Sequence, residues 1–201
     1  DNHALMEKQP EYIRQLESLP EKLKKAWLYG SWDLFEGQFF EEFRTSPDPA
    51  ACEKLGLSLE DAKRQGRFTH VIPPFDLATG ARKHWQIYRS YDFGYAKPFS
   101  CGWWAIDPEG VMYRILELYG CTDTPDEGVK WTPETQFAQI AQLERTHPWL
   151  KGKQILGVAD PAIWDASRGE SISQTAARCG VYFTPGDHAR VSGWMQCHYN
   201  T

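Results

Sequence analysis

The stretch from residue 84 to residue 119 predicts three successive β-strands, and this pattern limits the possible folds more than any other feature. Residues 84–92, 100–106 and 111–119 are rich in the aromatic and β-branched side chains that strands favour. Asp107-Pro108-Glu109-Gly110 separates the last two and has proline and glycine at the second and fourth positions of a β-turn. We therefore expect an antiparallel meander.

Helix and strand patterns then alternate. Residues 133–146 have apolar side chains at helical spacing, and residues 171–178 predict a second helix. Residues 154–159 form a short apolar run typical of a buried parallel strand, and residues 181–184 predict a fifth strand. Because strand–helix–strand crossovers are right-handed, we expect the fourth strand beside the first. The order β-β-β-α-β-α-β predicts an α/β fold with a ribonuclease H-like mixed sheet.

The N-terminal part of the chain lacks this regularity. Residues 8–28 have helical spacing with a break near Pro20. Residues 45–83 look irregular apart from a short helix from Ser58 to about Gln65, which Gly66 ends. We therefore divide the chain into a helical linker with an irregular segment, 1–83, and a mixed-sheet domain, 84–201.

Composition excludes several classes of protein. No apolar run approaches the roughly 18 residues of a membrane-spanning helix. A net charge of -5 argues against a basic surface along the whole chain, although not against a local one. The five cysteines form no CxxC and the six histidines no HxH or HExxH, so a zinc site is not expected. Reduced thiols in a cytoplasm are the simplest interpretation.

Two aspartates end strands that are expected to be neighbours. Asp92 lies in the motif Ser-Tyr-Asp-Phe-Gly at 90–94, and Asp160 follows the fourth strand. Parallel neighbours place both carboxylates at one edge of the sheet, about 4.8 Å apart. Such a pair repels unless a cation lies between its members, and Mg²⁺ or Mn²⁺ prefers oxygen ligands. Two such ions can activate water and stabilise the leaving oxygen of a phosphodiester. A turn or cap role is the alternative for each aspartate alone.

Several motifs, taken in order, resemble one protein family. Those before the predicted sheet are Ala26-Trp27-Leu28-Tyr29-Gly30-Ser31-Trp32-Asp33 and Gly37-Gln38-Phe39-Phe40. Those within it lie at 90–94, 159–162, 169–172, 180–183 and 190–194. Together they resemble the C-terminal part of a tailed-bacteriophage terminase large subunit, the DNA-packaging motor. The first group is similar to the linker that leaves the packaging ATPase domain, and the second to the nuclease domain.

The resemblance implies a metal-dependent endonuclease that cuts concatemeric double-stranded DNA. Asp92 and Asp160 would be its catalytic, metal-binding residues, holding Mg²⁺ or Mn²⁺, with two ions when the site is complete. The small terminase subunit and the portal protein would be partners of the full protein, without membrane association, in the cytoplasm of a bacterial host. The ATPase motif G-x-x-x-x-G-K-[ST] does not occur and the chain starts without Met, so we expect a fragment.

The resemblance leaves the metal site one acidic ligand short. The third carboxylate of the family lies beyond a later strand, and no residue of this chain fits it. Asp165 is a weaker candidate than Asp160, since it lies five residues past the strand end. Glu117 would be an outer ligand if its side chain shares the face of Asp92. Asp187-His188-Ala189-Arg190 stands where the family often has Asn-Asp-Arg.

Three basic residues near the aspartates, Lys97, Arg168 and Arg190, are candidates for contacts with the phosphate backbone. Solvated surface charge is the alternative for each. Two other functions stay open for the chain. One is a catalytically incomplete module that docks DNA or motor partners. The other is a different ribonuclease H-like enzyme, such as a junction resolvase or transposase.

Overall fold

The structure is a computed structural model that describes residues 43–167 and 169–187. The described residues divide between Pro73 and Pro74 into two compact units. The predicted helix at 8–28 and the motifs before residue 43 lie outside them. No helix of the described ranges is long and apolar enough to cross a membrane.

The first unit contains two short helices, α4 (Pro49–Lys54) and α5 (Leu59–Gln65). The predicted helix ending at Gly66 is confirmed as α5, where Ser58 Oγ accepts a hydrogen bond from Asp61 N at 3.1 Å. Gly66 ends this helix in the left-handed conformation, with φ 63°. The sequence analysis missed α4, although Asp48 caps it and proline occupies its first turn.

The second unit is built on one mixed sheet. Its strands are β1 (Gln86–Asp92), β2 (Ser100–Ile106), β3 (Met112–Tyr119), β4 (Ile155–Ala159) and β5 (Thr184–Pro185). Their order is β3-β2-β1-β4-β5, with the β1–β2 and β2–β3 pairs antiparallel and the β1–β4 and β4–β5 pairs parallel. This is the strand arrangement of a ribonuclease H-like sheet, so the predicted fold class and the position of the fourth strand beside the first are confirmed.

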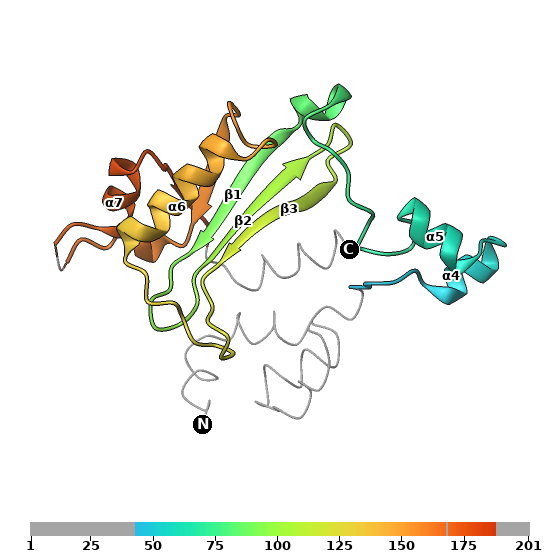
Figure 1. Ribbon diagram of the computed structural model, residues 1–201, viewed down its shortest axis with the longest axis horizontal. Helices are drawn as coiled ribbons and strands as arrows, with labels where there is room; N and C mark the ends of the chain where they lie inside the picture. The colour runs from blue at the N-terminus through green and yellow to red at the C-terminus, as the bar shows by residue number, and fades with distance from the viewer. Residues whose placement is uncertain (1–42, 168, 188–201) are drawn as a thin grey trace, which may run out of the picture. The chain divides into compact units, whose positions relative to one another are not determined.

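Helices cover one face of this sheet (Figure 1). They are α6 (Pro133–Thr146), η3 (Pro161–Trp164) and α7 (Ile172–Arg178), whereas η2 (Gly80–His84) precedes β1 and has no buried residue. Thr132 caps α6, and a capping box of Ser171 and Gln174 begins α7. The two predicted helices of this region are confirmed.

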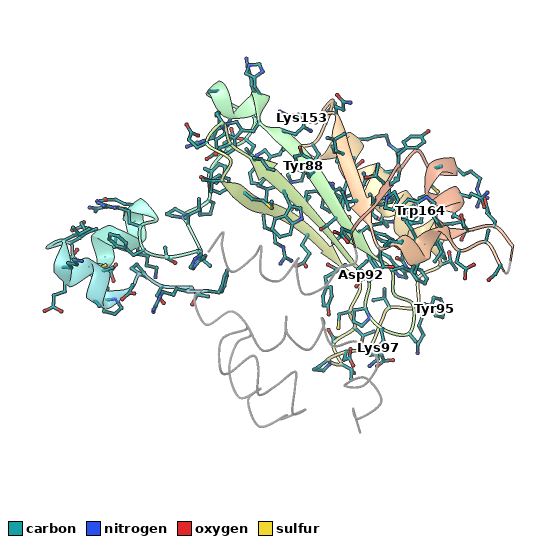
Figure 2. The ribbon with its side chains drawn as sticks, turned by 180° about the vertical axis from the view of Figure 1, so that it is seen from behind. Tyr88, Asp92, Tyr95, Lys97, Lys153 and Trp164 are labelled. Atoms are coloured by element: carbon teal, nitrogen blue, oxygen red, sulfur yellow. The ribbon has the colours of Figure 1, made fainter. Side chains whose placement is uncertain are left out.

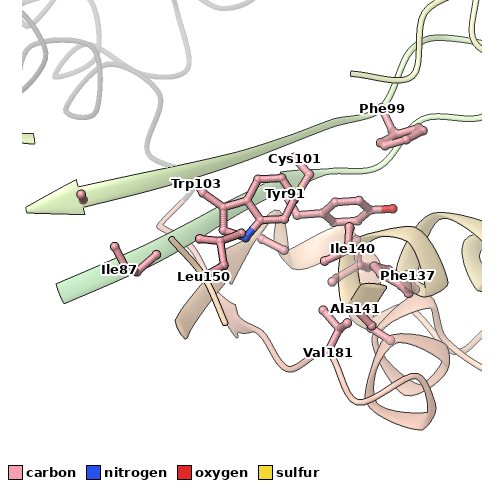
Figure 3. Close-up of a cluster of buried hydrophobic side chains, with 14 of the residues drawn as sticks. Ile87, Tyr91, Phe99, Cys101, Trp103, Phe137, Ile140, Ala141, Leu150 and Val181 are labelled. Atoms are coloured by element: carbon pink, nitrogen blue, oxygen red, sulfur yellow. The ribbon is translucent and has the colours of Figure 1, made fainter. Parts of the chain in front are cut away.

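The core lies between the sheet and α6. Strand residues alternate between the faces, so that Ile87 and Tyr91 of β1 are buried and Ser90 between them is exposed. Figure 3 shows Tyr91 against α6, where its ring centroid lies 5.1 Å from that of Phe137. Leu77, which the sequence analysis placed in the irregular segment, also lies in this core. The boundary between residues 83 and 84 stays a prediction.

The predicted fifth strand is wrong in its bounds. The sheet pairs Thr184 and Pro185 rather than residues 181–184. Arg89 explains part of the difference, because its Nη2 donates a hydrogen bond to the carbonyl oxygen of Tyr182 at 2.6 Å. The Tyr182 carbonyl oxygen therefore accepts its hydrogen bond from a side chain, whereas in a strand it would accept one from the backbone of the neighbouring strand.

Candidate active site

Asp92 and Asp160 lie together at the carboxyl ends of β1 and β4. Tyr91 pairs with Ala159 in the parallel register, so the aspartate that follows each of them comes to the same edge of the sheet. Both aspartates line one pocket with a volume of about 450 Å³. Ser100, which pairs with Asp92 across β1 and β2, lines the same pocket. The sequence predicted this placement of the two carboxylates.

The side chain of Asp160 is held by the backbone that follows it. Its Oδ1 accepts a hydrogen bond from Ala162 N at 2.8 Å and so caps η3. The cap role that the sequence offered as an alternative is therefore real. It does not compete with a role in the pocket, since a carboxylate has two oxygens and several acceptor positions.

Burial and charge disfavour the ionised form of Asp92. Burial raises its pKa above the usual value, and the negative charge of Asp160 raises the pKa further. The two carboxylates are therefore close enough to repel each other. A cation between them would remove this repulsion, and carboxylate oxygens are the donors that Mg²⁺ and Mn²⁺ prefer. The two carboxylates thus offer the donor atoms that a hard divalent ion prefers.

A third carboxylate, Asp187, lines the same pocket, and the sequence analysis missed it. β5 pairs with β4, and Gly186 N donates a hydrogen bond to the carbonyl oxygen of Ala159 at 2.8 Å, which brings residue 187 to the site. Asp187 could have been found from the sequence, because ligands in sheets of this kind bind at the carboxyl ends of parallel strands. The wrong bounds of the fifth strand concealed it. Among the described residues, no three His, Cys, Asp or Glu side chains form a group that could hold a metal ion.

Two weaker candidates from the sequence do not line the pocket. Asp165 Oδ1 accepts a hydrogen bond from Ser167 N at 2.8 Å, and this bond lowers the pKa of Asp165. Glu117 does share the face of Asp92, because the register aligns it through Gly102 with Ser90. However, β2 separates it from β1.

The basic candidates give no direct support for a phosphate site. Lys97 forms an exposed ion pair with Asp126, a surface arrangement that contributes little to stability. Figure 2 shows Lys97 and Tyr95 beyond Asp92, past the end of β1. Arg168 and Arg190 lie outside the described residues, as does most of the loop at 187–190.

Comparison with known proteins gives similarity to solved structures only. No family model matches the chain, and no curated protein matches it significantly. The chain is similar to the large terminase of a thermophilic bacteriophage, solved in more than one crystal form. In crystal form 2 the identity is 16% over 54% of this chain and 24% of that chain, with a TM-score of 0.42. In crystal form 3 the identity is 18% over 62% of this chain and 30% of that chain, with a TM-score of 0.43.

The nuclease domain of the P22 large terminase is a further similar structure. Its identity is 14% over 63% of this chain and 60% of that chain, with a TM-score of 0.44. The chain therefore spans less than two thirds of each of these proteins. All three are structures of terminases, and the sequence motifs also resemble the terminase family. At these identities and TM-scores, the function proposed below rests on the chain's own residues.

Proposed function

We propose that this chain is the nuclease part of a viral DNA-packaging terminase and hydrolyses phosphodiester bonds of concatemeric double-stranded DNA. One observation carries the proposal: Asp92 and Asp160 lie at the carboxyl ends of neighbouring parallel strands and line one pocket, where burial and the charge of Asp160 raise the pKa of Asp92. A carboxyl group with a raised pKa beside a second carboxylate in a pocket is typical of sites that do chemistry or bind a cation.

Asp92 and Asp160 would hold Mg²⁺ or Mn²⁺, with two ions when the site is complete. Bound ions would lower the pKa of a water molecule and offset charge on the phosphodiester. Asp160 meets the pocket in an orientation set by its hydrogen bond to Ala162 N. Asp187 adds a further carboxylate on the side of β5.

The partners follow from the same proposal. The substrate would be duplex DNA, bound mainly through its phosphate backbone and therefore less tightly at high salt. In the full protein, the small terminase subunit and the portal protein would be partners, and the host cytoplasm the place of action.

The proposal is tested by nicking of supercoiled plasmid in the presence of Mn²⁺. We expect the wild-type chain to nick it, and Asp92→Ala and Asp160→Asn to be inactive. Asparagine at 160 keeps an oxygen that can cap η3, so its effect reports on charge rather than on folding. Asp165→Ala is the matched control outside the pocket and should cut at the wild-type rate. Equal cutting by Asp92→Ala would reject the site.

A second candidate function is a catalytically incomplete module that docks DNA or motor partners. The specific observation in its favour is that the described residues contain no group of three metal ligands. Calorimetric titration with Mn²⁺ separates the two functions. Binding in the micromolar range, abolished by Asp92→Ala, supports the nuclease. DNA binding in EDTA with neither Mn²⁺ binding nor cutting supports the module.

A further inference from the structure

Gln136, near the start of α6, lies fully buried and uses its whole carboxamide. Its Oε1 accepts a hydrogen bond from the Tyr91 hydroxyl at 2.6 Å. Its Nε2 donates to the carbonyl oxygens of Gly94 and Trp131, each at 2.8 Å. Burial raises the pKa of the Tyr91 phenol, which therefore keeps the proton that it donates. One acceptor and two donors of Gln136 are thus satisfied.

Two of these partners lie on either side of Asp92. Tyr91 precedes the aspartate and Gly94 follows it by two residues, so a single side chain of α6 holds the chain before and after Asp92. Both residues line the pocket, but the Tyr91 side chain is buried in the core, whereas that of Asp92 is exposed. Gln136 therefore contacts both flanks of Asp92 from inside the core, and the Asp92 side chain itself stays exposed.

The loop between β1 and β2, residues 93–99, is also closely packed. A Cβ atom on Gly94 would lie 2.4 Å from the carbonyl oxygens of Lys97 and Pro98. Gly128 N donates a hydrogen bond to the carbonyl oxygen of Ala96 at 2.8 Å, and a Cβ atom there would lie 2.4 Å from the carbonyl oxygen of Lys97. Only glycine fits at either position without a shift of backbone. A loop packed this closely transmits a change at Gly94 to its neighbours.

We propose that Gln136 is a positioning residue: it holds the Tyr91 side chain before Asp92 and the Gly94 backbone after it, and thereby sets the place of this carboxylate opposite Asp160. The proposal deepens the function proposed above and rests on it for the statement that Asp92 binds a metal ion. Loss of groups that orient metal ligands typically weakens metal affinity about tenfold or more. Without Gln136, the Tyr91 hydroxyl and the Gly94 carbonyl lose their buried partner, and the loop relaxes to find others.

The test compares three variants of the full chain. Gln136→Met keeps a side chain of similar length and removes all three hydrogen bonds. Tyr91→Phe removes one of them and is the milder variant should the first not fold. Thr175→Val is the matched control, since it deletes a buried hydroxyl in α7 that donates to the carbonyl oxygen of Ser171 at 3.3 Å.

Two readouts that do not depend on cutting are measured without DNA. The first is hydrogen exchange of the Gly128 amide in the metal-free protein, which reports whether the 93–99 loop stays in place. The second is Mn²⁺ affinity from electron paramagnetic resonance. For Gln136→Met we expect exchange about tenfold faster, because the loop opens more often, and affinity about tenfold weaker. Tyr91→Phe should change the exchange rate and the Mn²⁺ affinity by less, and Thr175→Val should change neither quantity.

The outcomes are separable. Unchanged exchange at Gly128 in Gln136→Met overturns the proposal, as does faster exchange with unchanged Mn²⁺ affinity. If the wild-type chain binds no Mn²⁺, the proposed function fails, and exchange at Gly128 alone then tests the role of Gln136. Faster exchange in Gln136→Met than in Thr175→Val supports the hold of Gln136 on the loop. Equal exchange in both variants rejects it.

Discussion

Replacing Arg89 by methionine tests the buried charge network at the centre of the sheet. Arg89 is only 2% exposed. It forms an ion pair with Glu144 of α6, donates to the carbonyl oxygen of Tyr182, and lies 4.4 Å from the centre of the Phe183 ring. Its Nε has no hydrogen-bond partner among the residues that the structure describes. The methionine would leave the charge of Glu144, whose side chain is 17% exposed, without its partner.

The expected loss is large because a nearly buried charge loses its partner. Removing one member of a buried pair typically costs about 3–5 kcal/mol of unfolding free energy. For a unit of this size that corresponds to a Tm lower by roughly 12–20 °C. Urea and thermal unfolding, followed by circular dichroism and tryptophan fluorescence, measure both quantities.

A double variant makes the reasoning refutable. Arg89→Met with Glu144→Gln removes both charges and keeps an acceptor for Trp103 Nε1, which donates to Glu144 at 2.9 Å. We expect it to recover at least half of the lost stability, since an apolar replacement of a whole buried pair is often nearly neutral. A loss below about 1 kcal/mol in Arg89→Met, the size typical of an exposed pair, would refute the argument. So would a double variant no more stable than the single one.

Three further predictions follow from the pocket and its surroundings. Because the pKa of Asp92 is raised, protons should compete with Mn²⁺ for this carboxylate at a higher pH than they do at an ordinary aspartate. As the pH is lowered, the Mn²⁺ affinity measured by calorimetry should therefore begin to fall at a higher pH than for a model carboxylate. The same raised pKa means that the folded state binds this proton more tightly than the unfolded state; metal-free protein should gain stability from Asp92 as the pH falls through the raised value. Asp92→Asn should accordingly raise the Tm of metal-free protein at pH 7, and an unchanged or lower Tm would contradict the repulsion from Asp160. Gly157→Ala should lower the unfolding free energy by about 1–3 kcal/mol, because its Cβ would lie 2.3 Å from the carbonyl oxygen of Tyr182 and 2.6 Å from Arg89 Nη2; wild-type stability in denaturant titration would show that this space is not filled.

Much of the sheet could be predicted because its signals are local. The turn at 107–110 is confirmed by a hydrogen bond from Gly110 N to the carbonyl oxygen of Asp107 at 3.0 Å. The right-handed crossover rule then placed β4 beside β1, which brings Asp92 and Asp160 to one edge of the sheet. Two physical rules, each independent of distant residues, were therefore sufficient for the pair of carboxylates.

The features that the sequence did not predict depend on residues that are far apart along the chain. Arg89 lies on the buried face of β1, and its partner Glu144 is 55 residues away. Alternation of apolar and polar side chains cannot reveal such a pair, because a charged residue on the core face looks like an interruption of the pattern. Asp187 was missed for a related reason, since the short β5 is set by its pairing with β4 and not by its own composition.

The cap that Asp160 forms on η3 has a consequence for ion binding. Folding already removes the rotational freedom of this side chain, because Ala162 N holds one of its oxygens. An arriving ion would therefore find one ligand immobilised beforehand, and little ordering entropy would be lost there on association. Glutamate at position 160 would keep the charge but move the carboxylate one methylene away from Ala162 N. The ion would then have to freeze a mobile side chain, and coordination would weaken although the number of carboxylates is the same.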